Sequence, residues 1–494
     1  MTLAKIVSYV SILALLGCSV EYQPLTQSEI SEAAADREAR LISADQEQLS
    51  GSLGLHEAMA RALKYNLDHQ IEIRNVSLAR TSKQLSEMDL LPDLVADAEF
   101  SRRSNEPGGQ SVNLGTGVTS ATGSRSSERT SSDANLTLSW DILDYGISYF
   151  RAQQSANDEL IAQEQRRAVV NRLMESTRTA YWRAVSEERL GDRINQILRK
   201  ADRALVQSRS LSNGGFADRT EGLIYQRDLL RVIGEMQALK RDLATAKPQL
   251  AALANLRPGQ SFKVRVPPRK TLPQVKQPAR QLVKMAYLNR PELREITYEQ
   301  RNLELDEKAS SLALLPSIRP FLTGSLDGND LLAEGDWLSA GTRVSWDLIS
   351  LFNNKKRRQV FGANKDLLDA RALALTHAIA TQVHISKARY DLLRKETRST
   401  AQFAEVSAQI SRAIQAESES GLTGLQEEVF EEVGAILAEL RFDARYAELQ
   451  SAYASVFQAV GLNNYPGELT GNESLQALES AIHDMWRKRG EGLH

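Results

Sequence analysis

The feature that most constrains what this chain can fold into is an internal duplication. Residues 62–68 open a predicted helix that ends at a Leu-Leu-Pro sequence, and residues 286–292, 224 positions later, open a similar helix with the same ending. A Ser-Trp-Asp motif begins at Ser139 and again 206 positions later at Ser345. Because the matching blocks keep their order over some 200 residues, each half is predicted to be one structural repeat.

The duplication sets the expected boundaries. We assign residues 53–256 to the first repeat and residues 279–465 to the second. Between them, residues 257–278 contain five prolines, six basic residues and no acidic residue, which indicates an extended linker; a basic recognition segment is the alternative. Residues 466–494 form a tail whose apolar residues recur at helical spacing, which predicts a short amphipathic helix.

Each repeat contains two segments that alternate apolar and polar residues as a β-strand does. In the first repeat they lie at about 93–104 and 133–141, and a loop rich in Gly, Ser, Thr and Asn separates them. In the second repeat they lie at about 317–326 and 338–347, with a short loop between them. The pattern predicts two β-hairpins within an otherwise helical chain, so the fold class is mostly α with a small β part.

The remaining segments read as long helices. No proline interrupts residues 145–212, and small or apolar residues recur there in steps of three and four, as in a coiled-coil seam. A helix of this length extends about 100 Å. A glycine-containing break separates it from a second helix at 218–255, and the second repeat has the same arrangement at 353–420 and 424–460.

The N-terminus indicates an exported lipoprotein. Only one charged residue, Lys5, precedes an apolar run, and Leu-Leu-Gly before Cys18 resembles the signal at which bacterial lipoproteins are cleaved and acylated. We therefore expect a signal peptide at residues 1–17, a covalent lipid on Cys18 and an anchored segment at residues 18–52. Ser19 is typical of sorting to the outer membrane of enteric-type bacteria. An ordinary signal peptide with an incidental cysteine is the alternative.

Composition and motifs argue against several other classes. The 61 basic and 63 acidic residues give no basic excess for nucleic acid, and the single cysteine permits neither a disulfide framework nor a cysteine-cluster metal site. The sequence lacks His-Glu-x-x-His, Gly-x-Ser-x-Gly and phosphate-loop motifs. His377 and His384 share a predicted helix face but are too few for a zinc site. We expect no enzyme, no metal, and no cofactor besides the lipid.

The predicted strands require partners that one chain does not supply. A lone two-stranded hairpin is not stable, and a membrane does not tolerate unpaired strand edges. Several copies that pool their strands resolve this conflict. Three copies with four strands each provide twelve strands, within the range known for outer-membrane barrels, and the long helices then continue as a helical tube.

The complete pattern resembles the TolC-like outer-membrane factor family, in its lipoprotein branch. Helix, Leu-Pro, strand, loop, strand, Ser-Trp-Asp, long helix, glycine turn and helix occur twice between residues 50 and 465. The resemblance implies a homotrimer whose α-helical barrel is continuous with a 12-stranded outer-membrane β-barrel, four strands from each chain. The sequence departs from the family's usual Phe-Asp-Gly turn at residues 144–146, and departs further at residues 350–352.

The resemblance also implies a role for the two glycine-containing turns between the long helices. In the family these turns form the periplasmic tip, where the adaptor protein docks and the pore narrows. The candidates for adaptor contact in this sequence are Gly214, Gly215, Gly421, Leu422 and Thr423. Glycine permits the chain reversal through positive φ values, and the alternative is that these segments are turns and nothing more.

An acidic cluster beside the second turn is the candidate pore gate. Glu427, Glu428, Glu431 and Glu432 fall on an arc of about 140° of one helix. In a trimer they form a ring of carboxylates, and such rings select cations and gate pores. Family members often carry acidic aperture residues near the start of this helix, and Glu427 is the nearest match by position. A solvated acidic outer face is the alternative.

The resemblance implies a function and a set of partners. The chain is expected to be the outer-membrane channel of a tripartite efflux system that works with a periplasmic adaptor protein and an inner-membrane pump of the RND type. It would be surrounded by outer-membrane lipid and bind no nucleic acid. A conduit for type I protein secretion or metal export is one alternative, and a lipid-anchored periplasmic coiled-coil scaffold is the alternative from another class.

Overall fold

The computed structural model describes residues 22–43, 46–49, 51–213, 219–257, 259–268, 274–420, 424–463, 465 and 473–491. The chain divides into two compact units, residues 1–49 and residues 50–494. Among the helices of the described residues, none has the length and apolar composition needed to cross a membrane.

The described part of the smaller unit contains one helix, α2 (Gln27–Ser43). Thr26 and Glu29 form a capping box at its start. The backbone N–H and the hydroxyl of Thr26 each donate to the Glu29 carboxylate at 2.8 Å, and the Glu29 N–H donates to the Thr26 hydroxyl at 3.3 Å. The predicted signal peptide and Cys18 lie outside the described residues.

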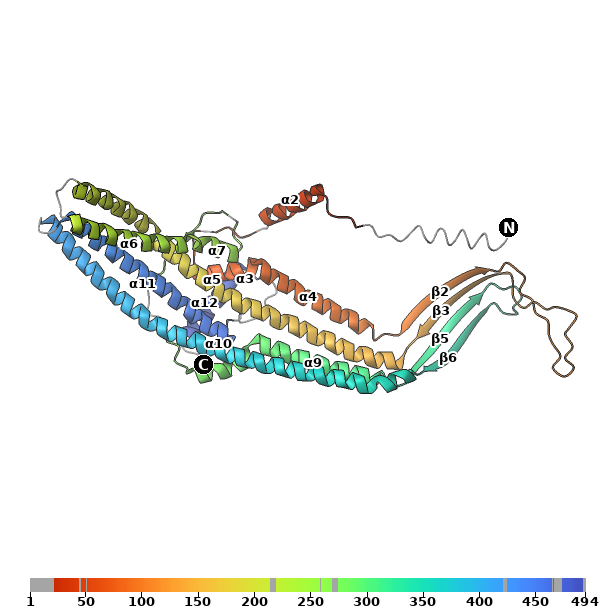
Figure 1. Cartoon of the computed structure of the whole chain (residues 1–494). Coiled ribbons are helices and arrows are strands. Elements are labelled where there is room, and N and C mark those ends of the chain that lie inside the picture. The colour runs from red at the N-terminus through yellow and green to blue at the C-terminus, as the bar shows by residue number, and fades with distance from the viewer. Residues whose placement is uncertain are drawn as a thin grey trace. The chain divides into compact units, whose positions relative to one another are not determined.

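The larger unit contains the helix–hairpin–helix pattern twice (Figure 1). The first copy consists of α3 (Leu55–Tyr65), α4 (Leu67–Met88), β2 (Asp93–Arg102), β3 (Thr130–Ser139), α5 (Ile142–Asn213), α6 (Arg219–Ala244) and α7 (Ala246–Leu253). The second consists of α8 (Ala279–Asn289), α9 (Pro291–Leu312), β5 (Ser317–Asp327), β6 (Asp336–Ser345), α10 (Leu348–Glu419) and α11 (Leu425–Val460), and the tail forms α12 (Leu475–Glu491).

The Ser-Trp-Asp motif marks the point where each second strand gives way to a long helix. Asp141 accepts hydrogen bonds from the N–H groups two and three residues further on, at 2.9 and 3.2 Å. Asp347 does the same at 3.1 and 3.2 Å. These N-caps satisfy the unpaired donors of the first turn, and α5 and α10 then each continue for 72 residues.

The first helix of each repeat is interrupted, whereas the sequence predicts one continuous helix that ends at Leu-Leu-Pro. Asn66 and Arg290 occupy equivalent positions and are both extended, with ψ of 128° and 122°. The Asn66 side chain accepts from the N–H groups of Asp68 and His69 and so caps α4. Pro291 disfavours a helical conformation at Arg290, and it stands at the first position of α9.

The helix expected at 218–255 is also interrupted, at Thr245, between α6 and α7. Pro248 stands in the first turn of α7, where its missing N–H costs nothing, and a continuous helix through it would lose a hydrogen bond. The strands lie where the alternation placed them, although β2 ends at Arg102 and β3 begins at Thr130.

The linker is held against the body of the larger unit. Strand β4 (Lys263–Val264) pairs in parallel with β1 (Ser52–Leu53). The Tyr181 hydroxyl of α5 donates to the Arg265 carbonyl at 2.6 Å, and Arg189 donates to the Pro267 carbonyl at 3.0 Å. The described part of the linker is therefore a packed strap along α5. Residues 258 and 269–273 lie outside the described ranges.

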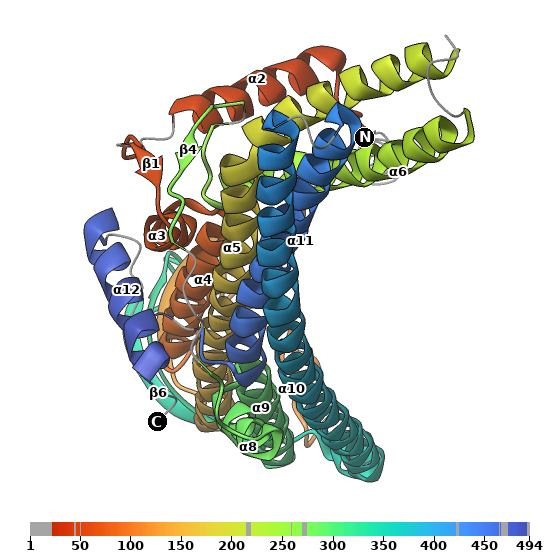
Figure 2. The same ribbon diagram turned by 90° about the vertical axis from the view of Figure 1, so that its left-hand side faces the viewer.

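Four helices and four strands follow the same lateral order. The antiparallel sheet runs β2-β3-β5-β6. Helices α4, α5, α9 and α10, which adjoin these strands in the chain, lie side by side in the same order (Figures 1 and 2). The two repeats do not form separate units, because α5 of the first packs against α9 and α11 of the second.

Among the residues that the structure describes, two apolar cores hold the helices together. The larger is built from α3, α8 and α12, from the middle of α5 and α10, and from the C-terminal end of α11. The second lies further from the sheet, where α5, α6 and α11 meet around Ile194, Ile233 and Val433. Buried side chains of this kind each contribute about 1.5–3 kcal/mol relative to exposure.

Helix α12 is anchored in the first core by a stack of cations and rings. Two guanidinium groups lie close to the ring of Trp486, with Arg178 at 4.4 Å and Arg489 at 4.6 Å from the ring centre. Phe457 of α11 packs edge-on against Trp486 at 5.6 Å. Cation–π contacts that are removed from water are each worth up to about 2 kcal/mol, so α12 is an integral part of the body.

The contact between α3 and α12 is expected to depend on pH. His56 and His483 meet edge to face at 5.0 Å. Burial, followed by the charges of His483 and Arg178, lowers the pKa of His56 to about 4. An unfolded His56 binds its proton near pH 6.5, so stability present above that pH is lost as the pH falls toward 4. We expect a loss on the order of 2 kcal/mol, after allowance for solvent screening.

Thermal unfolding of wild type and His56→Gln at pH 7 and pH 4.5 measures this effect. The variant should lose less stability than wild type on acidification. His377→Gln, at an exposed position of α10, is the matched control and should behave as wild type. An equal loss in all three proteins would show that His56 is not the group responsible.

Candidate functional site

The four-stranded sheet has one apolar and one polar face. The pairing register places Leu94, Leu138, Leu322 and Ala340 in one row, and the residues directly before and after them along each strand point to the opposite side. The apolar face carries Leu94, Ala96, Ala98, Phe100, Ala134, Leu136, Leu138, Ile318, Leu322, Leu326, Leu338, Ala340 and Val344. Its large side chains are exposed, and contiguous exposed apolar surface marks an interaction site.

The polar face is held by hydrogen bonds that cross the strands. Asn135 donates to Asp97 at 2.9 Å and accepts from the Ser325 hydroxyl at 2.8 Å, so it joins β2, β3 and β5. The hydroxyls of Thr137 and Thr323 lie 3.0 Å apart between β3 and β5. Hydrogen bonds that cross the strands in this way stabilise the pairing and fix its register.

The sheet has two open edges. Within the described ranges, the outer edge of β2 and the outer edge of β6 have no strand partner. The helices that adjoin these strands, α4 and α10, also expose apolar stripes, with Ile71, Leu78 and Leu85 on α4 and Val360 and Leu367 on α10. An open edge beside exposed apolar surface is a template for pairing with another chain.

The corners between sheet and helices are built around the two tryptophans. Trp346 donates from its indole nitrogen to the Leu314 carbonyl at 3.0 Å, and Trp140 packs edge-on against Tyr145 at 5.4 Å. Both rings remain about half exposed. Both tryptophans therefore pack at the corner and also expose part of their rings. These observations are compatible with corner packing and with anchoring at a membrane interface.

At the opposite end of the bundle, salt bridges join α5 of the first repeat to α11 of the second. They are Arg189–Asp443, at 2.6 Å, Arg193–Glu439 and Lys200–Glu432. Along both helices the partners advance by four and then seven residues, in opposite directions, so the helices keep one antiparallel register. We call these three pairs the α5–α11 ladder. Arg441 of α11 adds a pair to Glu235 of α6.

The ladder divides the acidic cluster into two halves. Glu432 pairs with Lys200, and Glu428 lies 3.8 Å from the same ammonium and accepts from the Ser418 hydroxyl of α10 at 2.6 Å. Glu427 is exposed and Glu431 partly exposed, and neither forms a side-chain salt bridge or hydrogen bond within the described part of the chain. The four carboxylates therefore do not act alike: Glu428 and Glu432 contact neighbouring helices, and no such contact is made by the other two within the described residues.

The remaining predicted site residues are not placed. Cys18, Gly214, Gly215, Gly421, Leu422 and Thr423 lie outside the described residues. The structure does describe the helix ends on either side of both turns, Asn213 and Arg219 for the first and Glu419 and Leu425 for the second.

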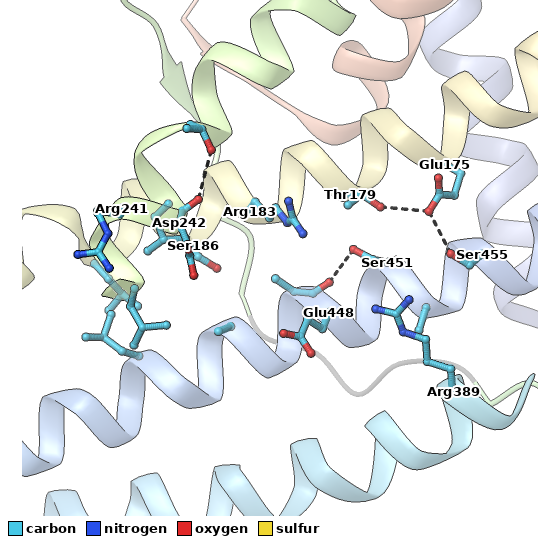
Figure 3. A pocket seen from close by; sticks show the side chains of 18 residues that line it. Glu175, Thr179, Arg183, Ser186, Arg241, Asp242, Arg389, Glu448, Ser451 and Ser455 are labelled. Atoms are coloured by element: carbon cyan, nitrogen blue, oxygen red, sulfur yellow. Dashed lines mark hydrogen bonds between the residues drawn. The ribbon is translucent and has the colours of Figure 1, made fainter. Parts of the chain in front are cut away.

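A groove of about 700 Å³ lies between α5, α6 and α11 (Figure 3). Its charged lining residues are Arg183, Arg241, Arg389, Glu175, Asp242 and Glu448. Glu175 accepts from the Ser455 hydroxyl at 3.0 Å and from the Thr179 hydroxyl at 3.4 Å (Figure 3). Three cations and three anions balance, and the described lining contains no histidine or cysteine, so the groove offers no nucleophile–base pair of the familiar kind.

No cluster of metal-ligating side chains is present among the described residues. His377 and His384 lie seven residues apart on α10, both exposed. Two imidazoles without a third ligand do not form a zinc site.

The fold matches solved structures of outer-membrane channels. Among these are the CmeC channel of Campylobacter jejuni (TM-score 0.65, 14% identity, 90% of this chain and 95% of that chain) and the MtrE channel of Neisseria gonorrhoeae in its open state (0.61, 17%, 85% and 95%). The outer membrane protein VceC of Vibrio cholerae matches with a TM-score of 0.59 and 13% identity over 82% of this chain and 96% of that chain. No protein family and no curated protein matches the sequence. The chain has the fold of outer-membrane channels, as the resemblance to TolC-like outer-membrane factors predicted.

Sequence reasoning missed the α5–α11 ladder. Its members occur within charged stretches of helices that are more than 200 residues apart in the chain, and only the packing of the repeats reveals which charges meet. The four-residue and seven-residue spacings on both helices are a signal that could have been used, once α5 and α11 were known to be neighbours.

Proposed function

We propose that three copies of this chain form a channel across the outer membrane of a Gram-negative bacterium, as the outer-membrane component of a tripartite efflux system. The observation that carries this proposal is the sheet, with an apolar face, a polar face and two open edges, continuous with four helices in the same lateral order.

The strands suit a closed barrel made by several chains. They contain 10 or 11 residues, and a tilted strand needs about 9–11 residues to cross a bilayer. Open edges do not occur in the hydrocarbon region, so β6 of one copy must pair with β2 of the next. Three copies provide twelve strands, with the apolar face toward lipid and the polar face toward a water-filled lumen.

The helices continue the barrel as a tube. Helices α4 and α10 end the row of four on either side, and their exposed apolar stripes would be buried between neighbouring copies. We propose that the tube spans the periplasm and that its far end, where the α5–α11 ladder lies, is the gate. A periplasmic adaptor protein would dock at the two turns, and an inner-membrane pump, of the RND type, would deliver the substrate.

The proposal is tested by the assembly and conductance of the purified full-length protein. We expect a trimer that resists SDS, dissociates on heating, and forms discrete ion channels in planar lipid bilayers. A monomer by light scattering that leaves bilayers silent would reject the channel and favour the periplasmic scaffold. In-cell crosslinking from positions 215 and 421, with mass spectrometry of the captured proteins, identifies the adaptor and the class of transporter.

We also propose that Cys18 carries the lipid and that residues 1–17 are removed. The support is the sequence around the cysteine alone. The intact mass of the mature protein should equal that of residues 18–494 plus an acylated glyceryl group. A mass without added lipid would reject the anchor and leave the channel proposal intact.

The structure sharpens the proposal for the acidic cluster. Because Glu428 and Glu432 are engaged by Lys200, the ring of carboxylates in the lumen would be formed by Glu427 and Glu431. We expect Glu427→Gln with Glu431→Gln to reduce the cation preference of the channel several-fold, because carboxylate rings select cations. The measurement is the reversal potential in a salt gradient.

Glu428→Gln with Glu432→Gln is the matched control, because it also removes two carboxylates, from the same two turns of α11. It should change gating more than selectivity. Unchanged cation preference in the Glu427/Glu431 variant would place that pair on the outer, solvated face.

A further inference from the structure

The two repeats share a strand register as well as a sequence pattern. Asp93 pairs with Ser139 in the first hairpin, and the residues 224 and 206 positions later, Ser317 and Ser345, pair with each other in the second. Every other pair of the first hairpin, up to Arg102 with Thr130, corresponds to a pair of the second in the same way. Equivalent residues of the two repeats are therefore paired in the same register in both hairpins.

The junction at the centre of the sheet is a template for the open edges. There β3 pairs with β5 from Asp133–Asp327 to Ser139–Phe321. By the same correspondence β3 is equivalent to β6 and β5 is equivalent to β2. Strands β6 and β2 are the two edge strands. The β3–β5 pairing at the centre of one copy therefore shows how β6 of one copy can pair with β2 of the next.

We infer that β6 of one copy pairs with β2 of the next in the register of the central junction, which sets Arg343 directly opposite Glu99. This inference rests on the proposed trimer and specifies its interface. The other pairs it defines are Ala340–Arg102, Gly341–Ser101, Thr342–Phe100, Val344–Ala98 and Ser345–Asp97.

The equivalent position at the central junction shows that such side chains reach each other. Arg343 corresponds to Thr137 and Glu99 to Thr323, and the hydroxyls of these two threonines lie 3.0 Å apart. Both pairs belong to the polar face. Where the centre of the sheet has two hydroxyls, the junction between copies has a guanidinium and a carboxylate, which is a stronger, charge-assisted contact.

The charges along the open edges support the same pairing. Within one copy, Glu99 lies opposite Asp133 and Arg343 lies opposite Arg319. Like charges directly opposite each other destabilise a sheet. Glu99 and Arg343 are exposed, and neither forms a side-chain salt bridge or hydrogen bond within the described residues. A second copy in the inferred register gives each of them a partner of opposite sign, and a trimer closes a ring of three such pairs.

The helices beneath the sheet give an independent contact in the same interface. At the central junction Gln154 of α5 donates to the Asn302 carbonyl of α9 at 2.9 Å. The equivalent residues on the outer helices are Val360 of α10 and Leu78 of α4, which are 59% and 66% exposed. The inferred junction brings these two apolar side chains together and removes both from water.

Cysteine pairs in the full-length protein test the register. Cβ atoms of directly opposed strand residues lie about 4.5–5.5 Å apart, within reach of a disulfide. After copper phenanthroline oxidation of membranes, Glu99→Cys/Arg343→Cys should give covalent dimers and trimers on heated, non-reducing gels. Each single variant should give none, which also controls for Cys18. In Glu99→Cys/Ser345→Cys the partners are displaced by two residues, about 7–8 Å apart, and should crosslink poorly.

Charge reversal tests the ion pair by a second measurement. Glu99→Arg and Arg343→Glu should each lower the temperature at which the trimer dissociates, and the double variant should recover most of that loss. Efficient crosslinking of the displaced pair, or no recovery in the double variant, in a protein that still forms the trimer would overturn the register. A native chain that forms no trimer would instead overturn the proposed function.

Discussion

The Leu136→Arg variant is expected to disappear from the outer-membrane fraction, whereas Thr137→Arg, one residue further along the same strand, is expected to assemble. Leu136 lies on the apolar face and is 52% exposed in a single copy, while Thr137 lies on the polar face. Arginine on the lipid face costs about 2–4 kcal/mol near the middle of the bilayer. In a trimer that cost applies three times, so assembly should fail.

Comparison of the two variants separates the effect of the sheet face from the effect of introducing arginine. Both variants introduce the same residue into β3, and Thr137→Arg also gives up the hydrogen bond between hydroxyls with Thr323, worth about 1 kcal/mol. The heat-modifiable trimer band in outer-membrane preparations measures the outcome. If both variants assembled equally well, the apolar face would not be the lipid-facing surface.

Charge reversal within the α5–α11 ladder is expected to open the channel. Lys200→Glu would place a third carboxylate beside Glu428 and Glu432, which are both partly buried. If the ladder holds the proposed gate closed, the lost attraction and the new repulsion together would destabilise the closed state by about 1–2 kcal/mol in each copy. Summed over three copies that act together, the open fraction should rise by at least an order of magnitude.

Single-channel recordings in planar bilayers measure this shift as longer open times or higher conductance. Lys200→Met keeps the aliphatic stem and removes only the charge, so it should give a smaller change in the same direction. Lys200→Glu combined with Glu432→Lys restores opposite signs and should return the channel toward wild-type behaviour. An increase that persists in the double variant would mean that the ladder is not the element that holds the tip closed.

Local chemistry explains why much of the fold could be predicted. The Ser-Trp-Asp motif already contains the cap that starts each long helix, and Asp141 and Asp347 act as that cap. The alternation of apolar and polar residues placed both hairpins, because one face of the sheet is mostly apolar. These features depend on residues that are neighbours in sequence, so they can be predicted without knowledge of the tertiary contacts.

The features that sequence reasoning missed depend on partners far apart in the chain or on single backbone positions. The breaks at Asn66 and Arg290 are single extended residues within otherwise helical patterns, and only a cap and a proline mark them. The different surroundings of Glu428 and Glu427, which are adjacent in sequence, depend on Lys200 in the other repeat. The role of the turn residues and of Cys18 stays a prediction.

Helices α5 and α10 have the same length, and this equality constrains changes in the length of either helix. Each has 72 residues, which corresponds to about 108 Å at 1.5 Å per residue, so their far ends, Asn213 and Glu419, lie the same number of residues from the sheet. Seven residues inserted into each helix of the α5–α6 pair alone would extend that pair by about 10 Å beyond the α10–α11 pair. If an adaptor protein docks at both turns at once, as proposed, insertions and deletions that change the length of the helices would have to occur in both repeats together.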